Sequence, residues 1–239
     1  MKTKLFPDDG YLCQTFRPMK PIAHIHTDFP AKFGIPRQSG LVDTLEGQVV
    51  FEPAFRHPDA VRGLESFSHI WLIWEFSETA RDTWSPVVRP PRLGGNRTMG
   101  VFATRSPFRP NPVGLSLVRL QRIVCGPDGP VLHVAGADLM DGTPIYDIKP
   151  YIRYTDCRPD ASDGYVGALH ERHLEVVFPD DLLQQIPDTK RAALLAVLQT
   201  DPRPAYQEDG KACGMAFAGH DIRFHVREGV LYVEGVRKI

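Results

Sequence analysis

Short runs of apolar residues dominate the first two thirds of the chain, and Gly or Pro lies close to most of them. Runs of this kind, bounded by turn-forming residues, predict β-strands. The candidate strands are Ile22–Thr27, Gln48–Phe55, His69–Ser77, Gly100–Thr104, Val113–Val124 and Pro130–Ala135. Because long helical periodicity is absent from this part of the chain, we expect a mainly β fold of the barrel or sandwich type.

Two of the candidate strands differ in their hydrophobic pattern. Ile70–Phe76 is apolar without alternation, which predicts a strand buried on both faces. The segment 113–117 alternates Val and Leu with Gly and Ser, as expected of a strand buried on one face.

The last 80 residues carry a different pattern. Asp180–Thr200 contains good helix formers, with Asp188 and Thr189 as possible N-caps and Asp201-Pro202 as a stop. Two strand-like runs, Asp221–Val226 and Val230–Val236, meet around Glu228-Gly229, which indicates a hairpin. This pattern predicts a small α+β domain.

These patterns divide the chain into three parts. Residues 1–20 contain two prolines and an Asp-Asp-Gly turn without periodicity, and we interpret them as an N-terminal extension. Residues 21–157 form the predicted β-barrel domain, and residues 158–239 form the small α+β domain.

The distribution of charge is more informative than the net charge of −1. The stretch from Val88 to Arg122 contains seven arginines and no Asp, Glu or Lys. Arginine presents a planar fork of donors that suits phosphate and carboxylate groups. The stretch is consistent with an anionic ligand, and equally with a solvated face paired with acids elsewhere in the chain.

Cysteine and histidine spacing does not favour a metal site. The four cysteines are scattered, and the pairs His24/His26 and His170/His173 lack partners at zinc spacing. Reduced thiols fit a cytoplasmic protein best. The N-terminus has no apolar signal region, and the longest apolar run, Ile70–Trp74, is far too short to span a bilayer. We expect neither a metal nor a membrane partner.

Common local signatures of enzymes are missing. The sequence has no GxGxxG after a strand, no GxxxxGK[ST], no HExxH and no GxSxG. A Rossmann-type cofactor site is therefore not expected. What remains are three polar segments rich in Gly or Pro, at 34–40, 103–114 and 137–144, and loops of this kind commonly carry binding residues.

Two of these loops have distinct chemistry. Arg105 and Arg109, held among prolines, could clamp a carboxylate or phosphates, or could be surface arginines of a structural crossover. Asp138 and Asp141 could accept hydrogen bonds from ribose hydroxyls, an amino group or a base, or could cap a turn. The local chemistry leaves both interpretations open.

Several long segments together resemble one protein family. They are 34–42, 60–71 (AVRGLESFSHIW), 89–100 (RPPRLGGNRTMG), 101–117 (VFATRSPFRPNPVGLSL), 138–151 (DLMDGTPIYDIKPY) and 201–206 (DPRPAY). In order and content they are similar to the TsaA-like (TrmO-type) tRNA adenine N6-methyltransferase family, over most of the chain from Pro21 onward. His26 stands where an arginine is expected in bacterial members.

The resemblance implies a small β-barrel that binds S-adenosylmethionine without a Rossmann fold. It implies methyl transfer to N6 of N6-threonylcarbamoyladenosine, next to the anticodon of tRNA, by a homodimer. The implied cofactor contacts are Gln38, Ser39, Gly40, Phe76, Ser77, Arg105, Leu115, Asp138, Leu139, Met140 and Asp141.

For the tRNA anticodon loop we expect contacts from Arg92, Arg109, Arg203 and Tyr206. An interdomain packing loop is the alternative for Arg203 and Tyr206. Two other functions stay open, a non-catalytic RNA-binding barrel protein and a methyltransferase acting on another small substrate.

Overall fold

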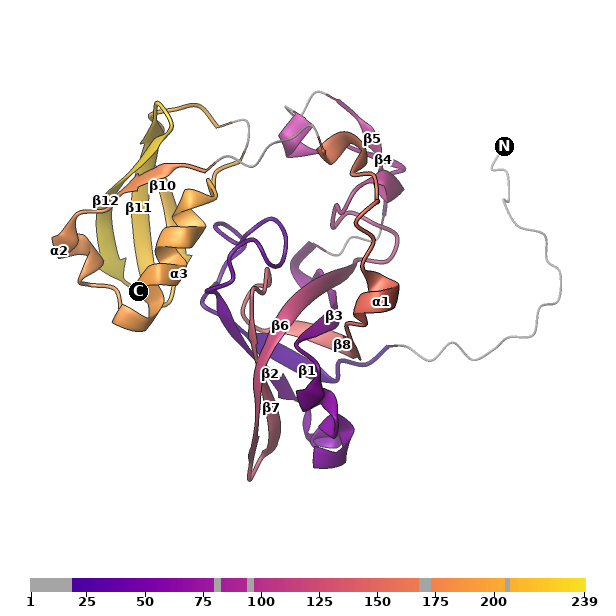
Figure 1. Ribbon diagram of the computed structural model, residues 1–239. Coiled ribbons are helices and arrows are strands. Elements are labelled where there is room, and N and C mark those ends of the chain that lie inside the picture. Colours follow the sequence, from indigo (N-terminus) through magenta and orange to yellow (C-terminus); the bar gives the residue numbers. More distant parts are fainter. Residues whose placement is uncertain (1–18, 80–82, 94–96, 168–172, 205–206) are drawn as a thin grey trace, which may run out of the picture.

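The computed structural model describes residues 19–79, 83–93, 97–167, 173–204 and 207–239. Figure 1 shows a barrel and, beside it, a second lobe made of a sheet and helices. The fold is mainly β, with a closed barrel followed by a small α+β lobe, which confirms the predicted fold class.

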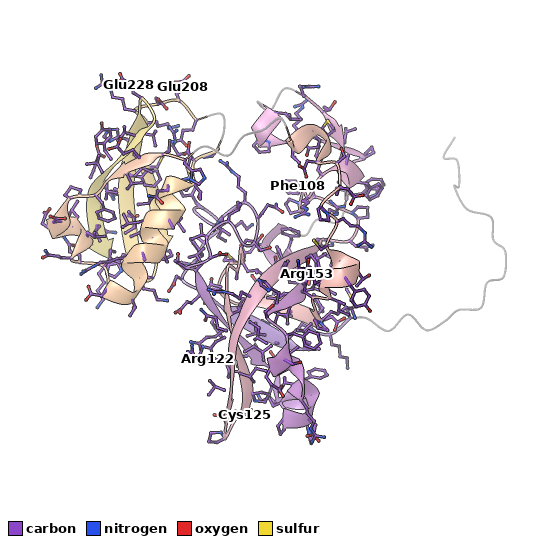
Figure 2. The ribbon with its side chains drawn as sticks, viewed as in Figure 1. Phe108, Arg122, Cys125, Arg153, Glu208 and Glu228 are labelled. Carbon is purple, nitrogen blue, oxygen red and sulfur yellow. The ribbon has the colours of Figure 1, made fainter. Side chains whose placement is uncertain are left out.

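The barrel consists of six strands in the order β1-β2-β7-β6-β3-β8, and β1 pairs with both β2 and β8 to close it. All of its neighbouring strands are antiparallel. The strands are β1 (Ala23–His26), β2 (Glu46–Phe51), β3 (His69–Glu75), β6 (Val113–Gly126), β7 (Gly129–Ala135) and β8 (Thr143–Pro150). Figure 2 labels Arg122 and Cys125 on the long β6–β7 hairpin, which extends away from the rest of the barrel.

Strand β3 does not have the burial that its sequence predicts. Ile70, Leu72 and Trp74 are buried in the barrel, whereas Trp71 and Ile73 on the other face are only partly covered. The prediction of a strand buried on both faces is therefore wrong. On this outer face Trp71 lies against Tyr151, with ring centroids 6.0 Å apart.

At its start, strand β6 presents Gly114 and Ser116, and not Leu115 and Leu117, to the barrel interior. Ser116 is fully buried and Gly114 is buried, while Leu115 is 56% exposed. Trp74 explains this arrangement, because it pairs with Gly114 across the strands and a Cβ on Gly114 would lie 2.3 Å from its ring. The large indole fills the space that a leucine would otherwise occupy.

The connections contain short 3-10 helices and one small extra sheet. The 3-10 helices include Pro53–Phe55, Pro58–Val61 and Leu64–Ser66 before β3, and β4 (Val87–Val88) pairs with β5 (Met99–Gly100). Two strand predictions are corrected here. The strand predicted over Gln48–Phe55 ends at Phe51, because Pro53 begins a helical turn. In the strand predicted over Gly100–Thr104, Val101–Ala103 form a 3-10 helix.

The second lobe begins after the helix α1 (Arg153–Asp156) and holds a sheet in the order β10-β11-β12-β9. Its strands are β9 (Glu175–Val177), β10 (Cys213–Phe217), β11 (His220–Arg227) and β12 (Val230–Lys238). The predicted hairpin is confirmed, since Glu228 and Gly229 both have positive φ, as a tight two-residue turn requires.

Two helices accompany this sheet, α2 (Asp180–Leu183) and α3 (Asp188–Gln199). Helix α3 buries Leu194, Val197 and Leu198, which form one apolar stripe. The capping prediction is wrong, because Pro187 occupies the N-cap position and Asp188 is already helical.

The long loop between β1 and β2 joins the two lobes. Phe29, Val42 and Leu45 from this loop are buried in the hydrophobic core of the C-terminal lobe. Phe29 meets Phe217 edge-on with ring centroids 5.3 Å apart. Asp28 also forms a 2.8 Å ion pair with Lys190 of α3. The loop is therefore packed against one lobe while it is connected to the other.

Candidate functional site

A cavity of about 660 Å³ lies where the β1–β2 loop meets one end of the barrel. Its wall combines four stretches of chain with the ends of β3 and β6. The lining residues are Lys32, Ile35, Pro36, Arg37, Gln38, Ser39, Trp71, Trp74, Glu75, Phe76, Ser77, Glu78, Thr104, Arg105, Pro107, Arg109, Val113, Gly114, Leu115, Leu117, Asp138, Leu139, Met140 and Thr143. Drug-sized ligands typically occupy cavities of roughly 300–1,000 Å³.

The β1–β2 loop is fixed to the barrel by its backbone and by a serine. The backbone N–H of Leu117 donates to Ser39 Oγ at 3.1 Å, and Gly40 N donates to Gly136 O at 2.9 Å. Both bonds hold the loop against β6 and the turn before β8. The side chains of Gln38 and Ser39 are thereby kept at the cavity wall.

The Pro-rich loop before β6 contributes two arginines in different ways. Arg105 donates to the side-chain oxygen of Gln38, so its guanidinium group joins two of the predicted loops. Arg109 donates to the carbonyl of Thr104 at 2.6 Å, and so holds its own loop while it also lines the cavity. Arg105 is the arginine better placed to meet an anionic group of a ligand.

Asp138 is the carboxylate that the barrel interior holds at the cavity. Ser116 Oγ donates to its Oδ1 at 2.6 Å, and Trp74 Nε1 donates to Ser116 Oγ at 2.9 Å. Burial raises the pKa of Asp138 above its usual range, opposed by hydrogen bonds from Ser116 and Ser39 and by the charge of Arg105. A carboxylate fixed in this way is suited to accept hydrogen bonds from a bound ligand.

A second carboxylate at the cavity, Glu75, was not predicted from the sequence. The Tyr146 hydroxyl on β8 donates to Glu75, and this bond with the nearby charge raises the pKa of Tyr146 to about 12. The two residues are 71 positions apart in the sequence. Nothing in the apolar run around Glu75 indicates a binding residue, so only the pairing of β3 with β8 reveals it.

The remaining wall is largely apolar. Trp74 and Phe76 pack with ring centroids 4.3 Å apart, and Leu115 and Leu117 project from the outer face of β6. A cavity with apolar walls and a few fixed polar groups is the usual form of a small-molecule site.

The structure brings most of the predicted cofactor residues together at this cavity. Gln38, Ser39, Phe76, Ser77, Arg105, Leu115, Asp138, Leu139 and Met140 line it. Gly40 and Asp141 are not among its lining residues. Asp141 Oδ1 instead accepts from the backbone N–H of Thr27 at 3.0 Å and lies 3.1 Å from His26 Nδ1, a geometry that favours the turn-capping alternative.

The expected tRNA contacts are placed less uniformly. Arg109 lines the cavity, but Arg203 is only 5% exposed and is paired with Asp201 and Asp209. The position of Arg203 favours the interdomain packing alternative. Tyr206 and the side chain of Arg92 lie outside the described residues.

Two further observations concern metals and membranes. Within the described residues, His, Cys, Asp and Glu do not gather in any group of three that could hold a metal ion. Over the same parts of the chain, every helix is too short or too polar to cross a membrane.

Comparisons with known proteins point to one family over nearly the whole chain. The family model of the tRNA-methyltransferase O N-terminal domain matches residues 24–157, and that of the TrmO C-terminal domain matches residues 171–239. The chain is 41% identical to the tRNA (adenine(37)-N6)-methyltransferase of Escherichia coli (strain K12), over 87% of this chain and 92% of the relative. It is 46% identical to the protein of the same name from Eikenella corrodens, over 73% of this chain and 99% of the relative.

A solved structure agrees with these matches. The crystal structure of TrmO from Pseudomonas aeruginosa superposes with a TM-score of 0.75 and 32% identity, and covers 92% of this chain and 98% of that one.

Proposed function

The chain belongs to the tRNA-methyltransferase O family, and we propose on that premise that it methylates N6 of adenosine 37 in tRNA, with S-adenosylmethionine as the methyl donor. The observation that carries the proposal is the cavity, where three loops place Gln38, Ser39, Arg105 and Asp138 beside apolar walls. We further propose that the substrate is N6-threonylcarbamoyladenosine, as the resemblance of the sequence to the family implies.

The cavity residues fit the chemical groups of S-adenosylmethionine. Arg105 supplies a cation for the carboxylate of the methionyl part, and Asp138 supplies an acceptor for ribose hydroxyls or an amino group. Leu115, Phe76 and Leu139 offer apolar surface for the adenine ring. Their combination accounts for cofactor binding by a barrel that has no glycine-rich phosphate loop.

When bound, S-adenosylmethionine supplies a sulfonium methyl group that is already activated. The residues of this chain then have to bind both reactants, align the accepting nitrogen with the methyl group and exclude water. Alignment of this kind can lower the reaction barrier by roughly 7–11 kcal/mol. Arg105 and Gln38 hold each other across two loops, and Ser39 is fixed to β6, so the binding groups are oriented before a ligand arrives. Such preorganisation lowers the entropy that the ligand must lose on binding.

The N6-threonylcarbamoyl group carries a free carboxylate beside the phosphates of the anticodon loop. The seven arginines between Val88 and Arg122 complement this charge, and we expect affinity for tRNA to fall steeply with salt. Bases of a single-stranded loop can be reached by a protein pocket, unlike paired bases. Arg109 at the cavity and Arg92 on the same stretch are the proposed contacts.

We also propose the remaining assignments on the strength of the family resemblance. Residues 21–157 form the S-adenosylmethionine-binding domain, residues 158–239 contact tRNA, and residues 1–20 are an extension. The protein works as a homodimer in the cytoplasm. Analytical ultracentrifugation tests the dimer, and a monomer at micromolar concentration contradicts it.

Mass spectrometry of tRNA nucleosides after incubation with the protein and S-adenosylmethionine tests the proposed reaction. We expect a gain of one methyl group on N6-threonylcarbamoyladenosine and no change in matched tRNA that lacks the threonylcarbamoyl group. Methylation of both tRNAs contradicts the substrate assignment. Binding of tRNA without binding of S-adenosylmethionine in isothermal titration identifies a non-catalytic RNA-binding protein instead.

A further inference from the structure

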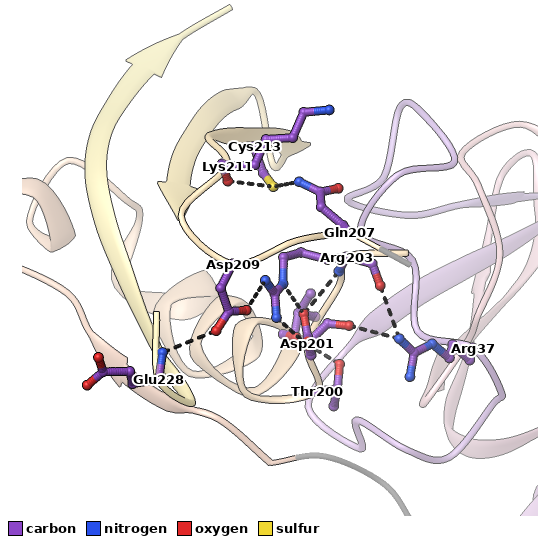
Figure 3. A network of polar contacts seen from close by, with 10 residues as sticks. Arg37, Thr200, Asp201, Arg203, Gln207, Asp209, Lys211, Cys213 and Glu228 are labelled. Carbon is purple, nitrogen blue, oxygen red and sulfur yellow. Dashed lines mark hydrogen bonds and ion pairs between the residues drawn. The ribbon is translucent and has the colours of Figure 1, made fainter. Parts of the chain in front are cut away.

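A buried arginine organises the turn that follows α3, as Figure 3 shows. Arg203 Nε and Nη2 donate to the two carboxylate oxygens of Asp201 at 2.8 and 3.0 Å, and Nη1 donates to Asp209 at 3.0 Å. Arg203 is 5% exposed, and Asp201 has a φ of +52°, which is unfavourable for a residue with a Cβ. The bidentate pair therefore holds the turn in a conformation that it would not readily keep alone.

This turn presents two backbone carbonyls to the β1–β2 loop. Arg37 Nη2 donates to the carbonyl of Asp201 at 3.2 Å and to that of Arg203 at 3.1 Å (Figure 3). Arg37 precedes these residues by more than 160 positions, so the contact joins the two lobes. One guanidinium nitrogen can reach both carbonyls only if the turn keeps them side by side.

From Arg37 the connection continues into the cavity. Gln38 Nε2 donates to the Arg37 carbonyl, and Gln38 Oε1 accepts from Arg105. Gly34, three residues before Arg37 in the same loop, lies so close to Met215 that a Cβ would be 2.1 Å from its sulfur. The C-terminal lobe thus contacts the loop at Gly34 and at Arg37, within the segment that lines the cavity.

We propose that Arg203 is a positioning residue for the cavity, acting through Arg37 on the loop that carries Gln38 and Ser39. In this role Arg203 does not contact RNA, and the C-terminal lobe sets the affinity for the small ligand as well as any affinity for tRNA. The proposal rests on the proposed function only for the identity of that ligand, S-adenosylmethionine.

Two measurements on the full chain test the proposal. Amide hydrogen exchange of the peptide covering residues 35–41 reports the loop without any ligand. Isothermal titration with S-adenosylmethionine reports the cavity. The variants are Arg37→Met, Arg203→Lys and the double variant, because a lysine keeps the charge beside Asp201 but loses the bidentate fork.

We expect each single variant to exchange at least tenfold faster at residues 35–41 and to bind S-adenosylmethionine at least fivefold more weakly. Because both act through the same contact, the double variant should lie within twofold of Arg37→Met. The control is Lys190→Met, which removes the Asp28 ion pair at the same interdomain contact without touching the carbonyls that hold Arg37. We expect it to lower the melting temperature while exchange at 35–41 and affinity stay within twofold of wild type.

Several outcomes overturn the proposal. Unchanged exchange at residues 35–41 in Arg203→Lys does so, as does a double variant whose losses add in full. Weaker tRNA binding by Arg203→Lys with an unchanged loop would show that the residue contacts RNA. If the wild-type chain does not bind S-adenosylmethionine, the cofactor assignment fails, and the exchange data still decide the positioning role.

Discussion

The two hydrophobic cores of the molecule are assembled in different ways. The barrel core draws on residues between Ala23 and Ile145, from the barrel strands and the segments next to them. The core of the C-terminal lobe combines residues from Leu174 to Val233 with three from the distant β1–β2 loop. The barrel closes on itself, whereas the second lobe completes its core with a loop that also lines the cavity. Stability of one lobe and ligand binding by the other are therefore linked through that loop.

The largest expected effect is that of Phe29→Ala. Phe29 is 1% exposed and packs on Phe217, so its loss should lower the free energy of unfolding by about 3–5 kcal/mol. Chemical denaturation measures this change, and hydrogen exchange locates it. We expect β10–β12 to lose protection while β2 and β7 keep theirs. Leu132→Ala, in the barrel core, is the matched variant and should affect the barrel strands first. Equal loss of protection in both lobes for both variants would show that the cores are one unit.

Gly34→Ala should have the next largest effect. Gly34 has a φ of +98°, and an added Cβ would meet buried Met215, so we expect a loss of roughly 2–3 kcal/mol in the free energy of unfolding. Gly40→Ala provides the control, since Gly40 has a φ of +78° but no atom within 4 Å of the added Cβ. Denaturant titration of both variants separates crowding from backbone strain, and equal losses would exclude the contact with Met215 as the cause.

Arg105→Ala tests the contact that Gln38 of the β1–β2 loop receives at the cavity. We expect at least a tenfold loss of S-adenosylmethionine affinity, equivalent to about 1.4 kcal/mol, with a melting temperature close to that of wild type. The matched control is Arg122→Ala, from the same arginine-rich stretch but outside the cavity lining. Isothermal titration measures both. A large stability loss with intact affinity would assign Arg105 a structural role.

Asp141→Ala should show the opposite behaviour to Arg105→Ala. Its carboxylate accepts from the backbone of Thr27 and does not line the cavity, so we expect a loss of about 1 kcal/mol in the free energy of unfolding. The affinity for S-adenosylmethionine should stay within twofold of wild type. A tenfold loss of affinity with unchanged stability would place Asp141 in the cofactor site.

The smallest effect concerns the pH dependence of Asp138. Burial raises the pKa of this carboxyl in the folded protein, so the folded state holds the proton more tightly than the unfolded state does. The stabilising contribution of the protonated form is present at low pH and is lost as pH rises through the raised pKa. Asp138→Asn cannot ionise, so its melting temperature relative to wild type should rise between pH 4 and pH 7. A difference that stays constant over this range would contradict the raised pKa.

The fold could be predicted from the sequence wherever alternation and turn residues are strong. The strands around Ile25 and Leu132 and the hairpin at Glu228-Gly229 were found in this way. Strand β8 is not among the predicted strands, because the polar segment at 137–144 covers its start and Asp147 and Lys149 interrupt its apolar residues. Which side chains of β6 face the barrel interior could not be predicted, because Ser116 faces inward on account of Trp74, which lies 42 positions away in the sequence.

The candidate site shows the same limit. The convergence of the three loops was inferred from their composition and from family resemblance, and nine of the eleven residues line one cavity. Glu75 and the interdomain role of Arg37 were not predicted. Both depend on partners far away in the sequence, Tyr146 and the turn at Asp201, and no local pattern encodes such a pair.

The residues of the β1–β2 loop that complete the C-terminal core also affect the order of events during synthesis. Once residue 150 has left the ribosome, every strand of the barrel is available for pairing. About 80 further residues must then be synthesised before Val233 and the rest of the core that buries Phe29, Val42 and Leu45 are available. At typical translation rates of about 5–20 residues per second, this interval is on the order of 4–16 s. During it the nascent chain exposes an apolar loop beside a finished barrel, which is the kind of surface that chaperones recognise.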